Sequence, residues 1–566
     1  MRRLLLMLLA AALLFMVLVA FPGAGGLRPV SADDPITARL AMPPVGTLDP
    51  ARIIPADQGA HDLAENLFAG LVRHDPYTNT IVPALARSWR VSADQLTWTF
   101  DLRDDIHWVR YDPSTGEVQT VRPVVSGDFY ATLRRACLPE PPNPAARSVY
   151  IIDGCRTVAR ANPLLVDEAF IEAHLGVRAP DPQTLEIRVI FEAPYLPALL
   201  ALPAFRPVPA EAIQPGMTTA DWTQPGVMLS TGPWVLAARS PESLTLIRNP
   251  FWPEPTAGNV AQVEVRFEPA DRLVAGIIAG QIDFARLDID AATAVALSAP
   301  GLVLALPGQT VIVLGFSAEL PVVSVEAARR ALALGLSRDA LVAALPQGMA
   351  LPMWRLTPPG TIGGPNEPLD NRGFAPEVAQ TALAEAGFAR CIFGEALEFM
   401  VEDTPMMVGL ARAIIEQWSV NLGCNTASFR LTRVPAAVVE RAANGTYSTI
   451  RRTDPTRPHL WLYAFTPDYQ DVNAWTGDGL HCRFGYLRPG VPCGPADMLV
   501  DLAALETDPA QRIARYNEAE AYWFGAGGTF PVAPLVVTRS LIARQPWLEG
   551  WTINGPLWLD GWTISR

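Results

Sequence analysis

The residues best suited to bind a charged ligand lie between positions 458 and 475. An apolar and aromatic run at 459–465 stops at a Thr-Pro pair, and the loop that follows carries Asp468 and Asp471 on either side of Tyr469. Phe465 and Trp475 flank this loop, so the pattern predicts a carboxylate inside an aromatic pocket. A carboxylate in such a pocket accepts hydrogen bonds from a cationic ligand group, each worth about 1.5–3 kcal/mol. The alternatives are a turn carboxylate that caps backbone amides and aromatic rings that belong to the core.

Motifs for catalysis are scarce. Residues 315–319 read Gly-Phe-Ser-Ala-Glu, which approaches the Gly-x-Ser-x-Gly nucleophile elbow but ends in glutamate instead of a small residue. The sequence has no His-Glu-x-x-His, no calcium-loop pattern and no lysine, which excludes Schiff-base chemistry and the P-loop and kinase lysines. These observations favour a binding protein without a cofactor. The alternative from another class, a secreted hydrolase, requires a nucleophile and a base that the sequence does not show.

Length and composition indicate a globular protein of several lobes. The chain has 566 residues, of which 50% are hydrophobic and 18% are charged. Its formal charge is −13, which argues against a nucleic-acid or anionic-membrane surface.

The N-terminus has the pattern of an export segment. Arg2 and Arg3 precede eighteen apolar residues at 4–21, and small residues and a Val-Ser-Ala site follow at 22–32. Residues 1–32 are therefore predicted to be a signal peptide or an uncleaved N-terminal anchor, because eighteen residues just suffice to span a bilayer. We expect an exported protein, periplasmic or otherwise extracytoplasmic.

Six cysteines suit an exported protein, in which an even number indicates disulfides. Their order favours three local pairs, although fifteen pairings exist in principle. The expected pairs are Cys137 with Cys155, Cys391 with Cys424, and Cys482 with Cys493. Zinc is the alternative interpretation at His481 and Cys482, but no spaced pair of cysteines or histidines completes four ligands.

Apolar periodicity predicts the elements that position these groups. The expected strands are 96–103, 184–191, 263–267, 311–316, 397–401, 428–434, 459–465 and 530–537, and the expected helices are 62–72, 270–280, 324–345, 376–387, 405–423, 436–444 and 509–523. Residues 121–182 are irregular and predict a small lobe of helices and loops. Strands that alternate with helices predict βαβ units and a largely parallel sheet.

Residues 230–252 carry a hairpin signature. Ser-Thr-Gly-Pro-Trp opens it, alternating apolar residues lie on both sides of Pro241, and an Asn-Pro pair ends the second strand. This segment resembles the Gly-Thr-Gly-Pro-Tyr … Arg-Asn-Pro-x-Tyr-Trp segment of the extracytoplasmic solute-binding proteins of ABC transporters, family 5, which include oligopeptide and dipeptide binders. Residues 65–72 are similar to the Glu-Asn-Leu-Phe-Glu-Gly-Leu-Val of that family, and residues 279–283 to its Ala-Gly-Glu-Ile-Asp. Residues 468–471 resemble its Asp-Tyr-Pro-Asp loop, with Gln470 in place of proline.

The resemblance implies an α/β fold of the type II periplasmic-binding-protein class, with two α/β lobes joined by a hinge and a smaller extra lobe. The implied lobe I comprises residues 33–62, 184–268 and 529–566, the small lobe II residues 63–183, and lobe III residues 269–528. It further implies that Asp468 binds a peptide α-amino group, and that Phe316 and Ser317 line the cleft at a strand end.

The implied function is that of the solute-binding component of an ABC importer. The protein would capture a peptide or similar small solute by hinge closure and deliver it to a membrane permease, as a monomer and without nucleic acid. Dipeptide binders place an arginine before the helix that here begins at Pro405, but this chain has Glu402-Asp403-Thr404 there, so a free dipeptide is disfavoured. A longer peptide, a sugar, an opine-like compound or another cation stays open as the ligand. An extracytoplasmic sensor or a peptide chaperone on the same scaffold is the alternative.

Overall fold

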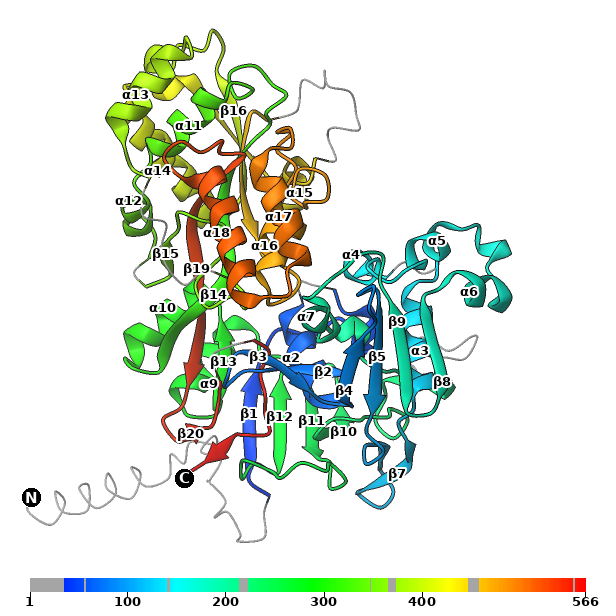
Figure 1. Cartoon of the computed structure of the whole chain (residues 1–566). Helices are drawn as coiled ribbons and strands as arrows, with labels where there is room; N and C mark the ends of the chain where they lie inside the picture. The colour runs from blue at the N-terminus through cyan, green and yellow to red at the C-terminus, as the bar shows by residue number, and fades with distance from the viewer. Residues whose placement is uncertain are drawn as a thin grey trace, which may run out of the picture. The chain divides into compact units, whose positions relative to one another are not determined.

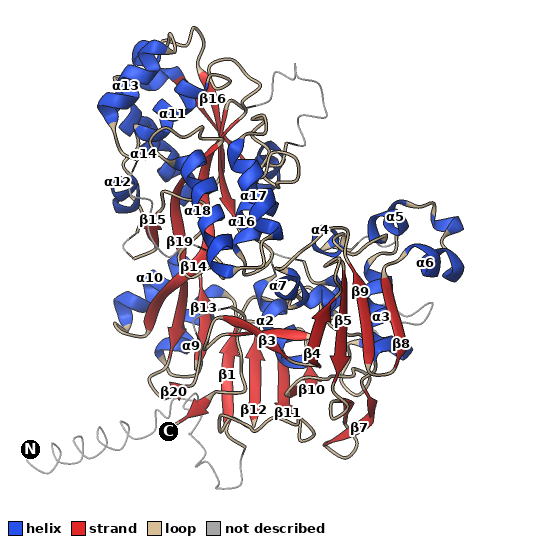
Figure 2. Cartoon of the chain, in the orientation of Figure 1, coloured by secondary structure: helices blue, strands red, loops and turns tan. Residues whose placement is uncertain are grey.

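A computed structural model describes residues 35–54, 57–139, 143–212, 222–346, 348–364, 373–445, 458–552 and 555–565 (Figures 1 and 2). The predicted export segment, residues 1–32, lies outside the described residues. Residues 37–566 form one compact unit. Among the described residues no helix combines the length and apolar character needed to cross a membrane.

One large mixed sheet runs through this unit (Figure 2). Its strands, in spatial order, are β10 (Trp234–Arg239), β11 (Ser243–Arg248), β12 (Gln262–Arg266), β1 (Thr37–Ala41), β13 (Phe284–Leu287), β19 (Val532–Arg544), β14 (Val303–Phe316), β18 (Leu460–Phe465), β16 (Leu397–Glu402) and β17 (Phe429–Val434), and β15 (Ala350–Pro352) pairs with β19. The predicted hairpin at 230–252 is confirmed as β10 and β11. The prediction of a largely parallel sheet is wrong, because β19, β14 and β18 pair antiparallel and only β12–β1–β13 and β18–β16–β17 are parallel.

Two long strands, β14 and β19, join the two main cores of the molecule. The first core contains residues of β1, β5 and β12, and the second core contains residues of β16, β18 and α14. In β14, Leu304 packs against the first core and Val311 belongs to the second. In β19, Ile542 belongs to the first core and Val536 to the second. The two cores are therefore joined by continuous strands. The lobe boundaries stay a prediction.

The region before β10 surrounds the first core with small sheets and short helices. Its strands are β2 (Val72–Asp75), β3 (Thr80–Pro83), β4 (Ala86–Val91), β5 (Thr97–Leu102), β6 (His107–Asp112), β7 (Glu117–Pro123), β8 (Val177–Asp181) and β9 (Thr184–Arg188). Its helices are α2 (Gln58–Leu67), α3 (Ser126–Ala136), α4 (Ala146–Val149), α5 (Cys155–Arg160), α6 (Glu168–His174) and α7 (Leu196–Leu200). The helix predicted at 62–72 is shifted, because Asp57 caps α2 and the backbone becomes extended at Phe68.

Helices cover the second core. They are α11 (Glu326–Leu334), α12 (Arg338–Ala343), α13 (Pro376–Glu385), α14 (Pro405–Leu422), α15 (Ala436–Ala443), α16 (Val472–Leu480), α17 (Pro495–Leu505) and α18 (Pro509–Phe524), while α9 (Ala270–Ile278) and α10 (Ile289–Ser298) pack near β13. The single helix predicted at 324–345 is wrong. It divides into α11 and α12, because Gly335 ends the first and the Ser337 hydroxyl caps the second. Helices α10, α16 and α17 have no counterpart among the predicted elements.

The tryptophan-rich tail returns to the first core. Asn66 in α2 donates its side-chain amide to the Leu557 carbonyl at 2.7 Å and accepts from the Leu559 amide at 2.9 Å. A short pair of strands, β20 (Leu548–Glu549) and β21 (Thr563–Ile564), closes the chain. The Glu-Asn-Leu-Phe segment is thus a structural motif that secures the C-terminal segment.

The three predicted disulfides are present. Their Cα atoms lie 5.0 Å apart in Cys137–Cys155, 4.9 Å in Cys391–Cys424 and 5.2 Å in Cys482–Cys493. Each bridge joins cysteines that are neighbours in the order of the sequence, so each closes a local loop.

Replacing Cys482 and Cys493 by serine should lower the free energy of unfolding by about 2–3 kcal/mol, because the bridge restricts the unfolded chain over a short loop. The double serine variant of Cys137 and Cys155 removes the bridge that closes a longer loop, with a sequence separation of 18 against 11. It should therefore lose slightly more stability. Urea unfolding followed by circular dichroism measures both. Equal stability of the wild type and the first variant would contradict the prediction.

Candidate ligand-binding site

Asp468 lies in the loop between β18 and α16. The loop is secured at its start, where the Thr466 and Thr310 hydroxyls lie 2.7 Å apart. It is secured at its end by Asp471, whose carboxylate caps α16 by accepting from the Asn473 amide at 2.8 Å. The loop therefore holds Asp468 in a defined position beside the first core.

Asp468 is half-buried in a very small pocket, with a cavity volume of about 10 Å³, that is otherwise mainly apolar. The pocket is lined by Ile53, His61, Ala145, Ser148, Leu202, Pro203, Ala204 and Asp468. The Ser148 hydroxyl donates to Asp468 Oδ2 at 3.4 Å, a long hydrogen bond. Burial raises the pKa of Asp468, and the charge of Arg147 opposes that rise. The carboxylate thus has weak protein partners and capacity for a further donor.

His61 supplies a second polar group to this pocket. Its Nε2 is buried and has no hydrogen-bond partner among the described residues. Burial lowers the pKa of His61 and so favours the neutral imidazole. An anionic acceptor and a neutral ring nitrogen therefore line the same apolar pocket.

Tyr469 packs toward the first core. Its ring stacks on Tyr195 with centroids 6.0 Å apart, and its hydroxyl donates to Asp478 Oδ2 at 2.8 Å. Asn473 donates to the same hydroxyl at 3.1 Å. Burial raises the pKa of Asp478, and the charge of Arg147 opposes this effect. Tyr469 is thus a buried residue of the Asp468 loop that packs the loop against Tyr195.

Asp471 has a structural role. Its two carboxylate oxygens accept from both terminal nitrogens of Arg512 in α18, at 2.7 and 2.9 Å. Both side chains are buried, 4% exposed for Asp471 and 10% for Arg512. Of the two aspartates in the predicted loop, only Asp468 faces a pocket.

The structure does not bring all predicted site residues together. Phe465 and Trp475 pack edge to face in the second core, with centroids 5.5 Å apart and exposed fractions of 5% and 0%. Phe316 pairs with Leu460 at one end of the β14–β18 ladder, whereas Val311 pairs with Phe465 at the end that leads to Asp468. Phe316 and Ser317 are buried and lie roughly 16 Å along the strand from that end. Phe316 and Ser317 therefore do not line the Asp468 pocket, and their place in a ligand cleft stays a prediction.

Four groups around Asp468 were not expected from the sequence: His61, Arg147, Ser148 and Tyr195. They come from α2, α4 and the start of α7, far from the loop in the chain. No local pattern marks them, because their position depends on how distant segments pack.

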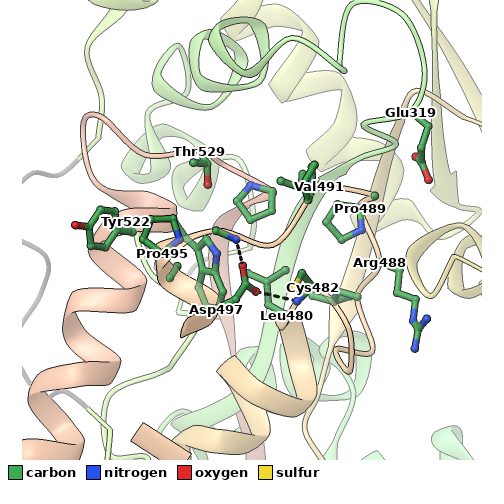
Figure 3. A pocket seen from close by; sticks show the side chains of 17 residues that line it. Glu319, Leu480, Cys482, Arg488, Pro489, Val491, Pro495, Asp497, Tyr522 and Thr529 are labelled. Carbon is green, nitrogen blue, oxygen red and sulfur yellow. Dashed lines mark hydrogen bonds between the residues drawn. The ribbon is translucent and has the colours of Figure 1, made fainter. Parts of the chain in front are cut away.

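A larger pocket, with a cavity volume of about 210 Å³, lies beside the loop that the Cys482–Cys493 bridge closes (Figure 3). Its walls are mostly proline, aliphatic and aromatic, and they include Pro489, Val491, Pro495, Trp523 and Pro531. The Asp497 carboxylate in this pocket already has hydrogen-bond partners, because it accepts from the backbone amides of Cys482 and Gly494, both at 2.8 Å. Val532 pairs with Gly315, so this pocket adjoins the Phe316 end of the strands rather than the Asp468 end.

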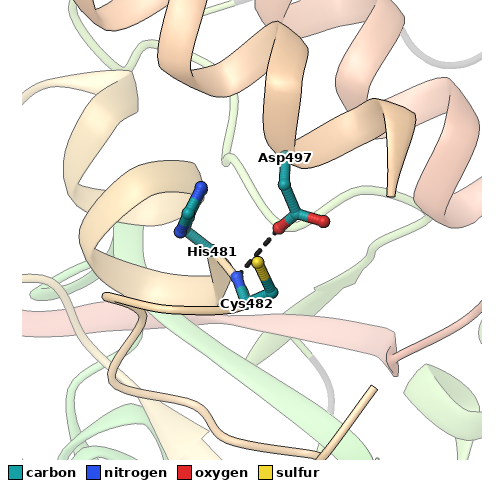
Figure 4. A group of neighbouring side chains, drawn as sticks. All are labelled: His481, Cys482 and Asp497. Atoms are coloured by element: carbon teal, nitrogen blue, oxygen red, sulfur yellow. Dashed lines mark hydrogen bonds between the residues drawn. The ribbon is translucent and has the colours of Figure 1, made fainter. Parts of the chain in front are cut away.

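His481, Cys482 and Asp497 form the cluster in which zinc is the alternative to a disulfide (Figure 4). The Cys482 sulfur is bonded to Cys493, Asp497 accepts two backbone amides, and His481 Nδ1 accepts from the Arg483 amide at 3.2 Å. The sulfur and the carboxylate are therefore already used within the protein, and His481 Nε2 lies 3.2 Å from Asp501 Oδ1. The cluster fits a structural role and not a metal centre.

The family follows from comparison with known proteins. The model of the middle region of the bacterial extracellular solute-binding proteins, family 5, matches residues 80–472. The chain belongs to this family. The family consists of binding proteins, so the prediction of an extracytoplasmic solute-binding protein rather than an enzyme is confirmed.

Relatives match nearly the whole chain. The periplasmic murein peptide-binding protein MppA of Escherichia coli is 26% identical over 524 residues, which cover 90% of this chain and 89% of MppA. The probable deoxycholate-binding periplasmic protein YgiS of Escherichia coli is 28% identical over 519 residues, 90% of this chain and 89% of YgiS. The unliganded open form of MppA superposes with a TM-score of 0.76 at 22% identity, over 94% of this chain and 98% of that one. The predicted two-lobed fold class is thereby confirmed.

Proposed function

We propose that the protein captures a peptide, or a similar small solute with a cationic group, at Asp468 and delivers it to the membrane permease of an ABC importer. In this proposal it acts outside the cytoplasmic membrane as a monomer, with residues 1–32 as signal peptide or anchor. The lobes close around the ligand by a hinge motion.

The observation that carries the proposal is the weakly satisfied carboxylate of Asp468. Its only hydrogen bond from a described side chain is the 3.4 Å contact with Ser148, and it lies in an apolar pocket beside the unpaired Nε2 of His61. A ligand ammonium group fits this environment, because a charge-assisted hydrogen bond gives the carboxylate the strong partner that it lacks. MppA, by its name, binds murein peptide, which favours a peptide ligand.

Replacing Asp468 by asparagine should weaken the binding of a peptide with a free amino terminus by about 1.5–3 kcal/mol, roughly ten- to a hundredfold, because the charge-assisted bond is lost. Thermal-shift screening of a short-peptide library followed by calorimetry measures this loss. On acidification, wild-type affinity should begin to fall at a higher pH than for an ordinary aspartate, because burial raises the pKa of Asp468.

Asp104→Asn is a matched control, because the Asp104 side chain is 75% exposed and pairs with Arg87 at the surface. It should leave affinity unchanged. Peptides with an acetylated amino terminus should bind wild type and Asp468→Asn equally weakly. Equal affinity of the free peptide for wild type and Asp468→Asn would contradict the role of Asp468. Binding of a steroid acid and of no peptide would contradict the peptide ligand and point to the ligand class in the name of YgiS.

A further inference from the structure

Arg147 is a fixed cation beside the Asp468 pocket. It lies in α4, next to Ser148, and its Nη2 donates to the carbonyl oxygens of Asp478 and Phe484, the latter at 2.9 Å. Its guanidinium carbon lies 5.5 Å from the centre of the Tyr486 ring, in a cation–π contact. Main-chain oxygens and a ring thus orient the guanidinium, and no carboxylate among the described residues neutralises it by direct contact.

The remaining donors of Arg147 are available. Its Nε and Nη1 have no acceptor among the described residues, and the residue is exposed. Asp468 is close enough to feel this charge, yet the two side chains form no ion pair. An oriented cation and a carboxylate that are neighbours but stay unpaired leave room for a ligand that satisfies both.

We propose that Arg147 determines specificity by binding an anionic group of the ligand while Asp468 binds its amino group. This inference rests on the proposed function and names the ligand class more closely: a dipolar peptide with a free carboxylate near its amino terminus. The protein itself carries a formal charge of −13, so its overall field opposes an anionic group on the ligand. A preference for such a ligand therefore requires a local cation, and Arg147 supplies one.

The test compares matched tripeptide amides that differ only in charge. Ala-Glu-Ala-amide and Ala-Gln-Ala-amide are titrated into wild type. A second pair, Ala-Ala-Glu-amide and Ala-Ala-Gln-amide, is titrated in the same way. Wild type should bind one glutamate peptide about tenfold more tightly than its glutamine partner, the effect of one charge-assisted hydrogen bond. Arg147→Gln should abolish this ratio while it retains affinity for the glutamine peptide, and Arg147→Lys should retain part of the ratio.

Arg156→Gln is the matched control. Arg156 is another exposed arginine of the same region that lies over a tyrosine ring, 5.4 Å from the centre of Tyr150, and its loss should leave the ratio unchanged. If Arg147→Gln weakens glutamate and glutamine peptides equally, Arg147 only holds α4 against the Asp478 segment and the inference is overturned. A wild-type ratio near one at both positions also overturns it, while the peptide function stands. If no peptide binds wild type, the proposed function fails and this inference fails with it.

Discussion

Replacing Arg512 by methionine should lower the free energy of unfolding by about 3–5 kcal/mol. The substitution leaves the Asp471 carboxylate buried, 4% exposed, without the two hydrogen bonds of 2.7 and 2.9 Å that now neutralise it. A buried charge that loses its partner costs far more than the net worth of the pair. Urea unfolding monitored by circular dichroism measures the effect.

Arg515→Met is the control on the same helix. Arg515 is 32% exposed and pairs with Glu506 at 2.8 Å, so its loss should cost about 1 kcal/mol or less. Adding Asp471→Asn to Arg512→Met should recover part of the lost stability, because no unpaired buried charge remains and the amide oxygen still accepts from Asn473. If Arg512→Met and Arg515→Met are equally stable, the buried ion pair contributes no more than the exposed one and the prediction is contradicted.

Replacing Trp475 by alanine should also cost about 3–5 kcal/mol, because the ring has no exposed surface and its removal leaves a cavity in the second core. The ring packs at 81° against Phe465, with centroids 5.5 Å apart. Chemical unfolding gives the stability, and calorimetry on the folded variant gives the affinity for peptide.

Trp89→Ala provides the comparison. Trp89 is only partly buried beside Phe100, so its loss should cost clearly less. The two measurements on Trp475→Ala also separate the core role from the predicted role in the cleft. A variant that keeps wild-type stability and loses peptide affinity would place Trp475 in the ligand site and not in the core.

Local patterns predict the elements whose signals lie in adjacent residues. The hairpin of β10 and β11 has its turn and stop residues in adjacent positions of the sequence. Helix α14 begins at Pro405 as predicted and ends at Leu422, with Gly423 as its C-cap. The division of 324–345 is also marked, by Gly335 and the capping Ser337, but the apolar periodicity of the whole stretch outweighs these signals. The prediction of strand direction fails for a different reason. The antiparallel pairing of β14 with β19 joins residues more than two hundred positions apart, and periodicity carries no information about such partners.

The site can be predicted only in part for the same physical reason. Asp468 follows a strand and a Thr-Pro break, so its place in a loop can be inferred. Which of its neighbours reach a pocket depends on packing: Trp475 turns into the core on α16, and Asp471 pairs with Arg512 on a helix about forty residues later. No local pattern marks His61 or Arg147 as a residue of the site, and only the fold places them beside the loop.

The two strands shared by both cores make folding of the large sheet depend on the C-terminal part of the chain. β19 pairs with β13 near the first core and with β14 along its length, and the segment that follows it binds Asn66. Strands β13 and β14 therefore complete their part of the sheet only with residues more than two hundred positions later in the chain. Pairing between such distant residues raises the contact order and slows folding. A protein truncated before β19 should lose structure in both halves, because β13 and β14 would each lose a sheet neighbour.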